Sequence, residues 1–273
     1  MAEPEVPLVP LRRDGGASAV RVRVRVGQTV RRTAHPWSPA VLDLLGHLER
    51  AGFIGAPRAL GFDEQGREVL SYVEGEVGAQ RRPGELGGGG LPDFVWRDDV
   101  LVRLGGLLRE FHDAAQTFPW VGREWCLAAR EPVETICHHE VFPWNTVFAA
   151  GLPVAFIDWD TAAPGPRASD LGFTASAWVP FWTDAKCRAA GLPTGVAEKA
   201  RRFRLFAEAY GRAPDVGIVH AGIDRMRDFL EHMRECAADG CEWETALARR
   251  GVLDEVALDI AWTEAHASAL LQS

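Results

Sequence analysis

Two periodicities of apolar residues divide this chain of 273 residues, and the change between them comes near residue 75. Residues 19–26 read AVRVRVRV, in which apolar residues alternate with arginine, and this period of two is typical of a strand with one buried face. Beyond residue 75 the apolar residues mostly recur at helical spacing. We therefore expect a small sheet followed by a larger helical part.

The first part is expected to be an antiparallel sheet with one helix. Gly27 and Gln28 form a two-residue turn that joins residues 19–26 to the strand TVRR. The two prolines of residues 6–12 allow that segment to be an edge strand at most. Residues 67–76 give a further strand.

The helix of this first part is expected over residues 38–52. Ser38 is placed at the N-cap and Pro39 at the first helical position, and Gly52 ends the helix. The glycine-rich residues 81–90 form a connection, so the boundary between the two parts is expected just before them, near Gly75.

The second part is expected to be mainly helical, with helices near residues 97–116, 168–178, 196–210, 215–238 and 252–270. Strand character returns only at residues 145–158. The expected fold class is therefore α+β, with one lobe at residues 1–75 and a second lobe at residues 76–273.

Charge and composition limit the classes of partner and compartment. The net charge of −8 argues against a general binder of nucleic acid or of anionic membranes. Five cysteines without CxxC spacing favour a reducing cytoplasm over a disulfide framework or a zinc site. No signal pattern or apolar run of about 18 residues is present. We expect a cytoplasmic protein with no membrane partner; the sequence predicts no oligomeric state.

The stretch CHHEVFPWN, residues 137–145, precedes two short apolar strands around a turn. If Gly151 and Leu152 form that turn, Asn145 lies directly opposite Asp158. One amide and one carboxylate are oxygen ligands that suit Mg²⁺. Glu140 lies in the same connection, five residues before Asn145.

The spacing His138-x-Glu140-x₄-Asn145 followed by Asp158 is that of the kinase catalytic loop and its metal aspartate. CHHEVFPWNTVF and PVAFIDWDTAAPGPRASDL resemble the aminoglycoside phosphotransferase and choline kinase-like family, whose usual form is HGDxxxxN followed by IDW or IDF. The resemblance covers most of the chain: GGASAVRVRVRVGQTVRR is similar to the nucleotide loop and strands, LSYVEGE to the hinge and LGGLLREFHDA to the first helix of the large lobe.

The resemblance implies a bilobal protein-kinase-like fold and transfer of the γ-phosphate of ATP to a hydroxyl of a small-molecule acceptor. It puts Glu140 at the position of the catalytic base, where the family has Asp, and makes His138 the histidine that braces the catalytic loop. Asn145 and Asp158 are the implied Mg²⁺ ligands. Asp160 either assists the metal or orients the loop, and Asp170 is expected to anchor the helix that follows.

The resemblance also implies a nucleotide site made by Gly16 and Ser18 of the glycine-rich loop and by Tyr72 and Val73 of the hinge. The only lysines are Lys186 and Lys199, so an arginine must contact the phosphates. Arg31 is our first choice and Arg32 the alternate, because neighbours on a strand face opposite sides. The nearest candidate for the acid that pairs with this arginine is Asp43.

Two other functions stay open. Glu140 adds a methylene to the aspartate of the family and no lysine is available, so the chain is alternatively a kinase-like protein that binds nucleotide or another ligand without efficient transfer. A protein kinase is less favoured, because no APE-like segment follows IDWD. The sequence does not identify the acceptor.

Overall fold

The computed structural model describes residues 4–7, 23–78 and 91–272. Its first part is an antiparallel sheet with the strand order β1-β2-β3-β5-β4. The strands are β1 (Val6–Pro7), β2 (Arg23–Val26), β3 (Thr29–Arg32), β4 (Ala59–Phe62) and β5 (Glu68–Ser71). Val26 pairs with Thr29, which confirms the two-residue turn at Gly27 and Gln28.

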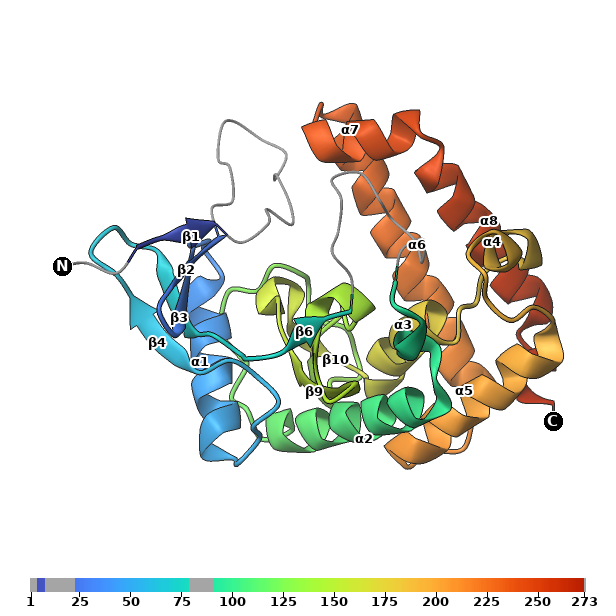
Figure 1. Ribbon diagram of the computed structural model, residues 1–273, viewed down its shortest axis with the longest axis horizontal. Helices are drawn as coiled ribbons and strands as arrows, with labels where there is room; N and C mark the ends of the chain where they lie inside the picture. Colours follow the sequence, from blue (N-terminus) through green and yellow to red (C-terminus); the bar gives the residue numbers. More distant parts are fainter. Residues whose placement is uncertain (1–3, 8–22, 79–90, 273) are drawn as a thin grey trace.

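Helix α1 (Ser38–Arg50) accompanies this sheet (Figure 1). Its leucines Leu44, Leu45 and Leu48 are buried, as the apolar spacing predicts. The predicted N-cap is wrong by one residue, because Trp37 is the N-cap and Ser38 is already helical. The Ser38 hydroxyl donates to the carboxylate of Glu68 on β5 instead.

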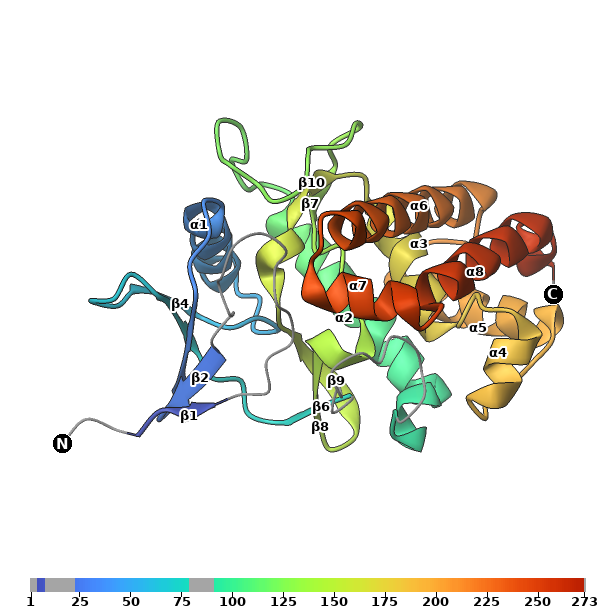
Figure 2. The same cartoon turned by 90° about the horizontal axis from the view of Figure 1, so that it is seen from above.

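The second part contains the other helices, most of which gather toward the opposite end of the molecule from α1 (Figures 1 and 2). The predicted helices correspond to α2 (Asp98–Ala115), α3 (Arg167–Trp178), α5 (Val196–Tyr210), α6 (Val216–Ala238) and α8 (Val252–His266). Two short helices, α4 (Asp184–Ala189) and α7 (Glu242–Arg249), were not expected from the sequence. Helices and antiparallel sheets together confirm the α+β class.

Two small sheets lie between the first sheet and the helices. One contains β6 (Glu76–Val77), β8 (Thr146–Ala149) and β9 (Leu152–Phe156), and the other pairs β7 (Thr135–Cys137) with β10 (Ala163–Gly165). The expectation that strands return only at residues 145–158 is therefore wrong. The strand expected over residues 67–76 is also interrupted: β5 ends at Ser71, and β6 pairs with β8 of another sheet.

Helices α3 and α6 approach each other backbone to backbone through two glycines. A Cβ atom on Gly172 of α3 would clash with the carbonyl oxygen of Ile218 and lie 2.6 Å from the backbone nitrogen of Gly222 on α6. A Cβ atom on Gly222 would likewise lie 2.6 Å from the carbonyl carbon of Gly172. Only glycine allows this close crossing.

Candidate active site

The hairpin of β8 and β9 places Asn145 and Asp158 at one end of the same pair of strands, but not opposite each other. Ala149 pairs with Leu152, so the turn residues are Ala150 and Gly151, with φ values of 51° and 75°. Two consecutive positive φ values match the twist of a hairpin, which explains why the turn forms there.

The predicted register is therefore wrong. The turn lies one position earlier than predicted, which moves each partner by two residues, and a bulge between Val147 and Phe148 moves it back by one, so that Thr146 pairs with Phe156. The carbonyl oxygen of Asn145 accepts a hydrogen bond of 2.8 Å from the backbone nitrogen of Ile157. Asp158 follows with φ 68° and ψ 61°, the left-handed region, which is uncommon for a residue other than glycine. The chain thus turns sharply at the predicted metal ligand.

The loop from His138 to Asn145 is closed by its own hydrogen bonds. The carbonyl oxygen of Glu140 accepts from the backbone nitrogen of Phe142 at 2.7 Å and from Nδ2 of Asn145 at 2.9 Å. His138 accepts from the backbone nitrogen of Glu140 at Nδ1 (3.3 Å), and its Nε2 lies 3.2 Å from the carbonyl oxygen of Ile157. Burial lowers the pKa of His138, and a neutral ring fits both contacts. His138 braces the loop against the strand that leads to Asp158.

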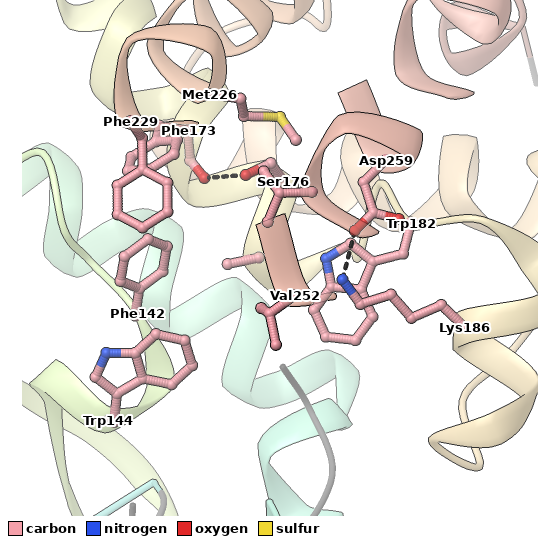
Figure 3. Close-up of a pocket in the computed structure, with 12 residues that line it drawn as sticks. Phe142, Trp144, Phe173, Ser176, Trp182, Lys186, Met226, Phe229, Val252 and Asp259 are labelled. Atoms are coloured by element: carbon pink, nitrogen blue, oxygen red, sulfur yellow. Dashed lines mark hydrogen bonds and ion pairs between the residues drawn. The ribbon is translucent and has the colours of Figure 1, made fainter. Parts of the chain in front are cut away.

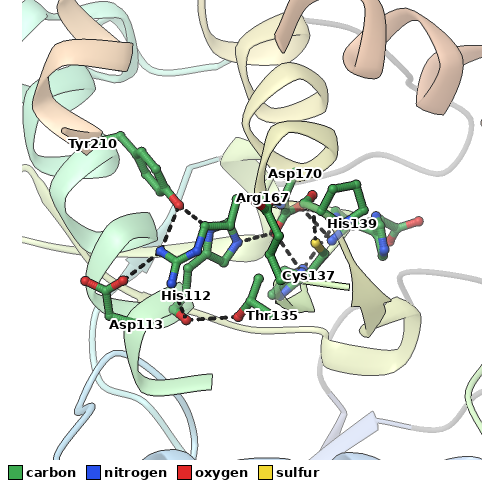
Figure 4. A network of polar contacts seen from close by, with 12 residues as sticks. His112, Asp113, Thr135, Cys137, His139, Arg167, Asp170 and Tyr210 are labelled. Carbon is green, nitrogen blue, oxygen red and sulfur yellow. Dashed lines mark hydrogen bonds and ion pairs between the residues drawn. The ribbon is translucent and has the colours of Figure 1, made fainter. Parts of the chain in front are cut away.

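Asp170 in the first turn of α3 holds the same loop from the other side (Figure 4). Its carboxylate accepts from the backbone nitrogens of His138 at 2.8 Å and His139 at 2.9 Å, and from Nε2 of His112 at 3.0 Å. Burial alone would raise the pKa of Asp170, but the hydrogen bond and charge of His112 and the neighbouring histidines lower it below its usual range. Asp170 therefore anchors the loop from His138 to Asn145, called the catalytic-loop segment below, rather than only its own helix.

The buried group formed by His112, Cys137 and Asp170 has its ligand atoms within 4.8 Å of one another. The hydrogen bonds to Asp170 already occupy both carboxylate oxygens, and the hydroxyl of Tyr210 lies 2.8 Å from Nδ1 of His112. These contacts make His112 and Asp170 part of a buried hydrogen-bonded network.

His139 occupies the position between His138 and Glu140 where the family pattern has glycine. Its φ is 64°, a backbone conformation that glycine adopts without strain. The side chain is buried, and burial lowers its pKa to about 3. Within the described residues its Nδ1 has no hydrogen-bond partner.

Arg32 on β3 reaches across from the first sheet to Asp158 and Asp160. Its Nη2 lies 2.6 Å from Asp160, and its Nη1 lies 3.6 Å from Asp158. Arg31 points to the other face of the strand, where its Nε lies 3.7 Å from Asp63. Of the two arginines considered for the phosphate contact, the alternate, Arg32, is thus the one beside the predicted metal ligand.

A second arginine, Arg23 on β2, meets the same carboxylate. Its Nη2 lies 2.6 Å from Oδ1 of Asp158 and 4.0 Å from Asp160. Sequence reasoning missed Arg23, although the turn at Gly27 and Gln28 pairs Arg23 with Arg32 and so puts both on one face of the sheet.

Glu68 on β5 is the acid that pairs with Arg32, and it was also missed. Its fully buried carboxylate contacts Nε of Arg32 directly. Burial alone would lower the pKa of Arg32, but the carboxylates of Asp160, Glu68 and Asp158 raise it. Asp43 on α1, the nearest candidate from the sequence, instead contacts Arg123 at the surface. The acid comes from the neighbouring strand rather than from the helix.

The oxygen atoms beside these arginines fit a magnesium ion. Asn145 is buried, and in the described part of the chain its Oδ1 has no hydrogen-bond partner while its Nδ2 is bound to the loop. An amide oxygen without a donor and the carboxylate of Asp158 are oxygen ligands of the kind that Mg²⁺ takes from proteins.

Comparison with known proteins agrees with this geometry. The model of the phosphotransferase enzyme family matches residues 120–229. The trifolitoxin immunity protein of Rhizobium leguminosarum bv. trifolii is 35% identical over 210 residues, which cover 72% of each chain. The chain belongs to the phosphotransferase enzyme family.

Solved structures show the same fold. A spectinomycin phosphotransferase in complex with ADP and spectinomycin has a TM-score of 0.57 at 9% identity, with 98% of this chain and 94% of that chain covered. A putative aminoglycoside phosphotransferase from Ralstonia eutropha has a TM-score of 0.55 at 14% identity, covering 97% and 94%. A choline/ethanolamine kinase family protein from Mesorhizobium loti has a TM-score of 0.54 at 16% identity, covering 99% and 93%. The protein-kinase-like fold expected from the sequence is confirmed.

Two of the other residues that the resemblance assigns to nucleotide binding lie in the part of this phosphotransferase family member that the structure describes. Tyr72 and Val73 lie in the connection from β5 to β6, and the backbone nitrogen of Tyr72 donates to Gln28 at 2.8 Å. The guanidinium of Arg25 lies 3.6 Å from the centre of the Tyr72 ring. Gly16 and Ser18 lie outside the described residues. No helix among residues 4–7, 23–78 and 91–272 is long and apolar enough to cross a membrane.

A pocket lies on the helical side of the catalytic-loop segment. Trp144 lines it, whereas Trp159 and Trp178, the other tryptophans near the motif, are fully buried in the core. The pocket and the loop share Phe142 and Trp144, which lie between Glu140 and Asn145 in the chain. The family member therefore has a pocket that borders the loop containing Glu140.

Proposed function

We propose that this chain is an ATP-dependent phosphotransferase that moves the γ-phosphate to a hydroxyl group of a small-molecule acceptor. The observation that carries the proposal is the contact of Arg32 with Asp158 and Asp160 between the first sheet and the helical part. The loop with Glu140 and Asn145 lies at the same end of the β8–β9 hairpin. Family membership supports the reaction class.

Each residue has a role in this proposal. Asn145 and Asp158 would hold Mg²⁺, which when bound neutralises charge on the β and γ phosphates. Arg32 binds the phosphate tail with its planar guanidinium, in the place where a lysine commonly serves. When nucleotide binds, the guanidinium of Arg23 gives up its ion pair with Asp158 and binds a phosphate oxygen instead. Glu140 orients the acceptor hydroxyl and accepts its proton.

The transfer step is balanced by these groups alone. The acceptor oxygen forms a bond to the γ-phosphorus, and the bond from the γ-phosphorus to the bridging oxygen of ADP breaks. The hydroxyl proton passes to the Glu140 carboxylate. Catalysis comes mainly from positioning and from charge stabilisation of the transferred group.

The methylene that distinguishes Glu140 from aspartate moves its carboxylate by about 1.5 Å. A displacement of about 1 Å can cost on the order of 100-fold in rate, so the loop must be built around the longer side chain if transfer is efficient. The substitution of His139 for the glycine of the family, directly before Glu140, is a second change in the same backbone segment. We propose that the two changes are matched.

A second candidate function is binding of nucleotide or another ligand without efficient transfer. The ion pair between Arg23 and Asp158 favours it, since a carboxylate engaged by arginine is a weaker metal ligand. The trifolitoxin immunity protein is named for protection against a toxin. Either function, modification of a toxin or its capture, is compatible with that relationship.

The test is calorimetric titration with a non-hydrolysable ATP analogue, with and without Mg²⁺. Arg32→Ala and Asp158→Ala should weaken metal-dependent binding at least tenfold. Arg31→Ala is the matched control, because it removes the same side chain from the same strand on the other face, and it should bind like the parent. Absence of nucleotide binding at millimolar concentration would refute the proposal.

Glu140→Asp separates the two functions in a phosphate-transfer assay on hydroxylated compounds. If the glutamate loop is adapted for transfer, the aspartate variant is slower than the parent. If the aspartate variant gains activity strongly while nucleotide affinity is unchanged, the native chain is a binder with a weakened catalytic base.

A further inference from the structure

The pocket beside the catalytic-loop segment is built by that loop and four helices (Figure 3). Its volume is about 620 Å³, including the part open to solvent. Phe142 connects it to the site, because its backbone nitrogen donates to the carbonyl oxygen of Glu140 at 2.7 Å. A molecule in this pocket lies against the segment that carries the proposed base.

One side of the pocket is a row of aromatic rings. The ring of Phe142 lies 4.8 Å from that of Trp144 and 5.2 Å from that of Phe173, and Phe173 lies 6.0 Å from Phe229. Figure 3 shows these four side chains along the same side. Such a row offers ring faces and edges to an apolar or planar molecule.

The opposite side carries one lysine and one carboxylate, and they neutralise each other. Nζ of Lys186 on α4 lies 2.5 Å from Oδ2 of Asp259 on α8, and Asp259 also accepts from the backbone nitrogen of Thr183 at 3.0 Å. The ammonium group of Lys186 lies 4.8 Å from the ring centre of Trp182. Breaking this pair to bind a charged ligand would leave a buried charge uncompensated.

The polar groups that remain do not favour a cation. The hydroxyl of Ser176 donates to the carbonyl oxygen of Phe173 at 2.7 Å. The buried guanidinium of Arg225 lies 4.9 Å from the ring centre of Phe173, one ring of the aromatic row. Among the described lining residues Asp259 is the one carboxylate, and Lys186 holds it. A polyamine would find no unpaired anion here.

We propose that this pocket binds the acceptor and that the acceptor is an uncharged molecule with an aromatic or similarly flat apolar body and a hydroxyl group. The body lies against Phe142, Trp144, Phe173 and Phe229, and the hydroxyl points along the loop toward Glu140. The identification of the occupant as the acceptor rests on the proposed function. The chemical class of the occupant rests on the lining alone.

The first experiment measures pocket binding without any reaction. The neutral fluorescent compound N-phenyl-1-naphthylamine is titrated into the parent chain and two variants of α8. Val256→Trp places a large ring into the pocket from a half-buried position and should weaken binding at least tenfold. Leu258→Trp makes the same kind of change at a site that is 60% exposed and outside the pocket, and it should bind like the parent.

Phe229→Ala provides a second variant that removes one ring of the row rather than filling the pocket. It should also weaken binding of the dye, and unchanged thermal unfolding of either variant shows that the chain is folded. Equal affinity of the parent, Val256→Trp and Phe229→Ala for the dye would overturn the proposal.

Competition distinguishes the chemical classes. The neutral alcohol 2-(2-naphthyl)ethanol should displace the dye, and the polycationic aminoglycoside kanamycin should not. Displacement by kanamycin at lower concentration than the naphthyl alcohol would overturn the proposed class.

Asp158→Ala separates this inference from the proposed function. It should weaken metal-dependent nucleotide binding at least tenfold and leave dye binding at the parental level. If the parent chain binds the dye but no nucleotide, the phosphotransferase function is refuted and the pocket proposal stands. If the parent chain binds nucleotide but not the dye, the pocket proposal is refuted and the phosphotransferase function stands.

Discussion

His139 makes the stability of the catalytic-loop segment depend on pH, and His139→Asn should remove a measurable part of that dependence. The ring is buried, and burial lowers its pKa from 6.5 to about 3. The unfolded chain therefore takes up the proton at a higher pH than the folded chain. Asparagine removes the titrating group and tolerates the positive φ of this position better than most residues.

The sign and size follow from that difference in pKa. Above pH 6.5 the ring is neutral in both states, so the stabilisation is complete there and is lost as the pH falls toward 3. In the middle of that window, away from both pKa values, each pH unit costs about 1.4 kcal/mol for one group. Between pH 6.5, where the unfolded ring is half protonated, and pH 4.5 the contribution of His139 to the free energy of unfolding thus falls by about 2.3 kcal/mol.

Urea unfolding of parent and variant at pH values from 7.5 to 4.5 measures this contribution. We expect the free energy of unfolding of the variant to fall by about 2.3 kcal/mol less than that of the parent between pH 6.5 and 4.5. His220→Asn, which replaces an exposed histidine on α6, is the matched control and should follow the parent. Parallel profiles of parent and His139→Asn would refute the reasoning, since they would mean that the proton binds equally in both states.

Three further changes test other parts of the structure. Glu68→Gln removes the carboxylate that pairs with the buried Arg32, so urea unfolding should show a loss of about 3 kcal/mol; an unchanged midpoint would mean that Asp160 suffices as the partner. Asp170→Asn should lower the free energy of unfolding by about 3 kcal/mol, because each carboxylate oxygen accepts from a backbone N–H group and the amide NH₂ would face one of these donors with another donor. An unfolding midpoint equal to that of the parent would contradict this. Gly172→Ala should lower the free energy of unfolding by about 3 kcal/mol, measured by thermal unfolding, because the added Cβ atom meets the backbone of α6. Gly106→Ala in α2 is the control: its added Cβ atom would lie 3.7 Å from the nearest atom, so alanine should raise the free energy of unfolding by up to about 1 kcal/mol. Equal effects of the two changes would show that the α3–α6 crossing adapts.

The sequence predicted the parts of the site that depend on short spacing. The residues from His138 to Asn145 form one connected loop, and their order along the chain was enough to place Glu140 beside Asn145. The turn at Gly27 and Gln28 was predicted for the same reason, because two flanking strands and a glycine determine it locally.

Contacts between distant segments were harder to predict. Alternation on β3 shows that Arg31 and Arg32 face opposite sides, but it does not tell which side meets Asp158, because that depends on how the first sheet sits on the rest. Glu68 was missed because the family pattern directs attention to a helix acid, whereas here a strand neighbour pairs with Arg32. A turn one position earlier than expected made the predicted opposition of Asn145 and Asp158 wrong, and the bulge in the hairpin offset only half of that shift.

Short elements escaped detection for another reason. Helix α4 has six residues, and β7 and β10 have three each, so none spans enough positions to establish a period. Their positions are determined by tertiary contacts rather than by local preference.

The glycine crossing of α3 and α6 has a consequence for how the pocket can change. Phe173 and Ser176 belong to α3, and Met226 and Phe229 belong to α6, so two walls of the pocket come from helices whose backbones already touch. These walls cannot move closer together, and separating them would break the contact between the helices. A variant of this chain that accepts a larger molecule would therefore need smaller side chains in the pocket or a shift of α8. Because α3 and α6 stay in contact, Phe173 and Phe229 of the aromatic row would keep their positions during such a change.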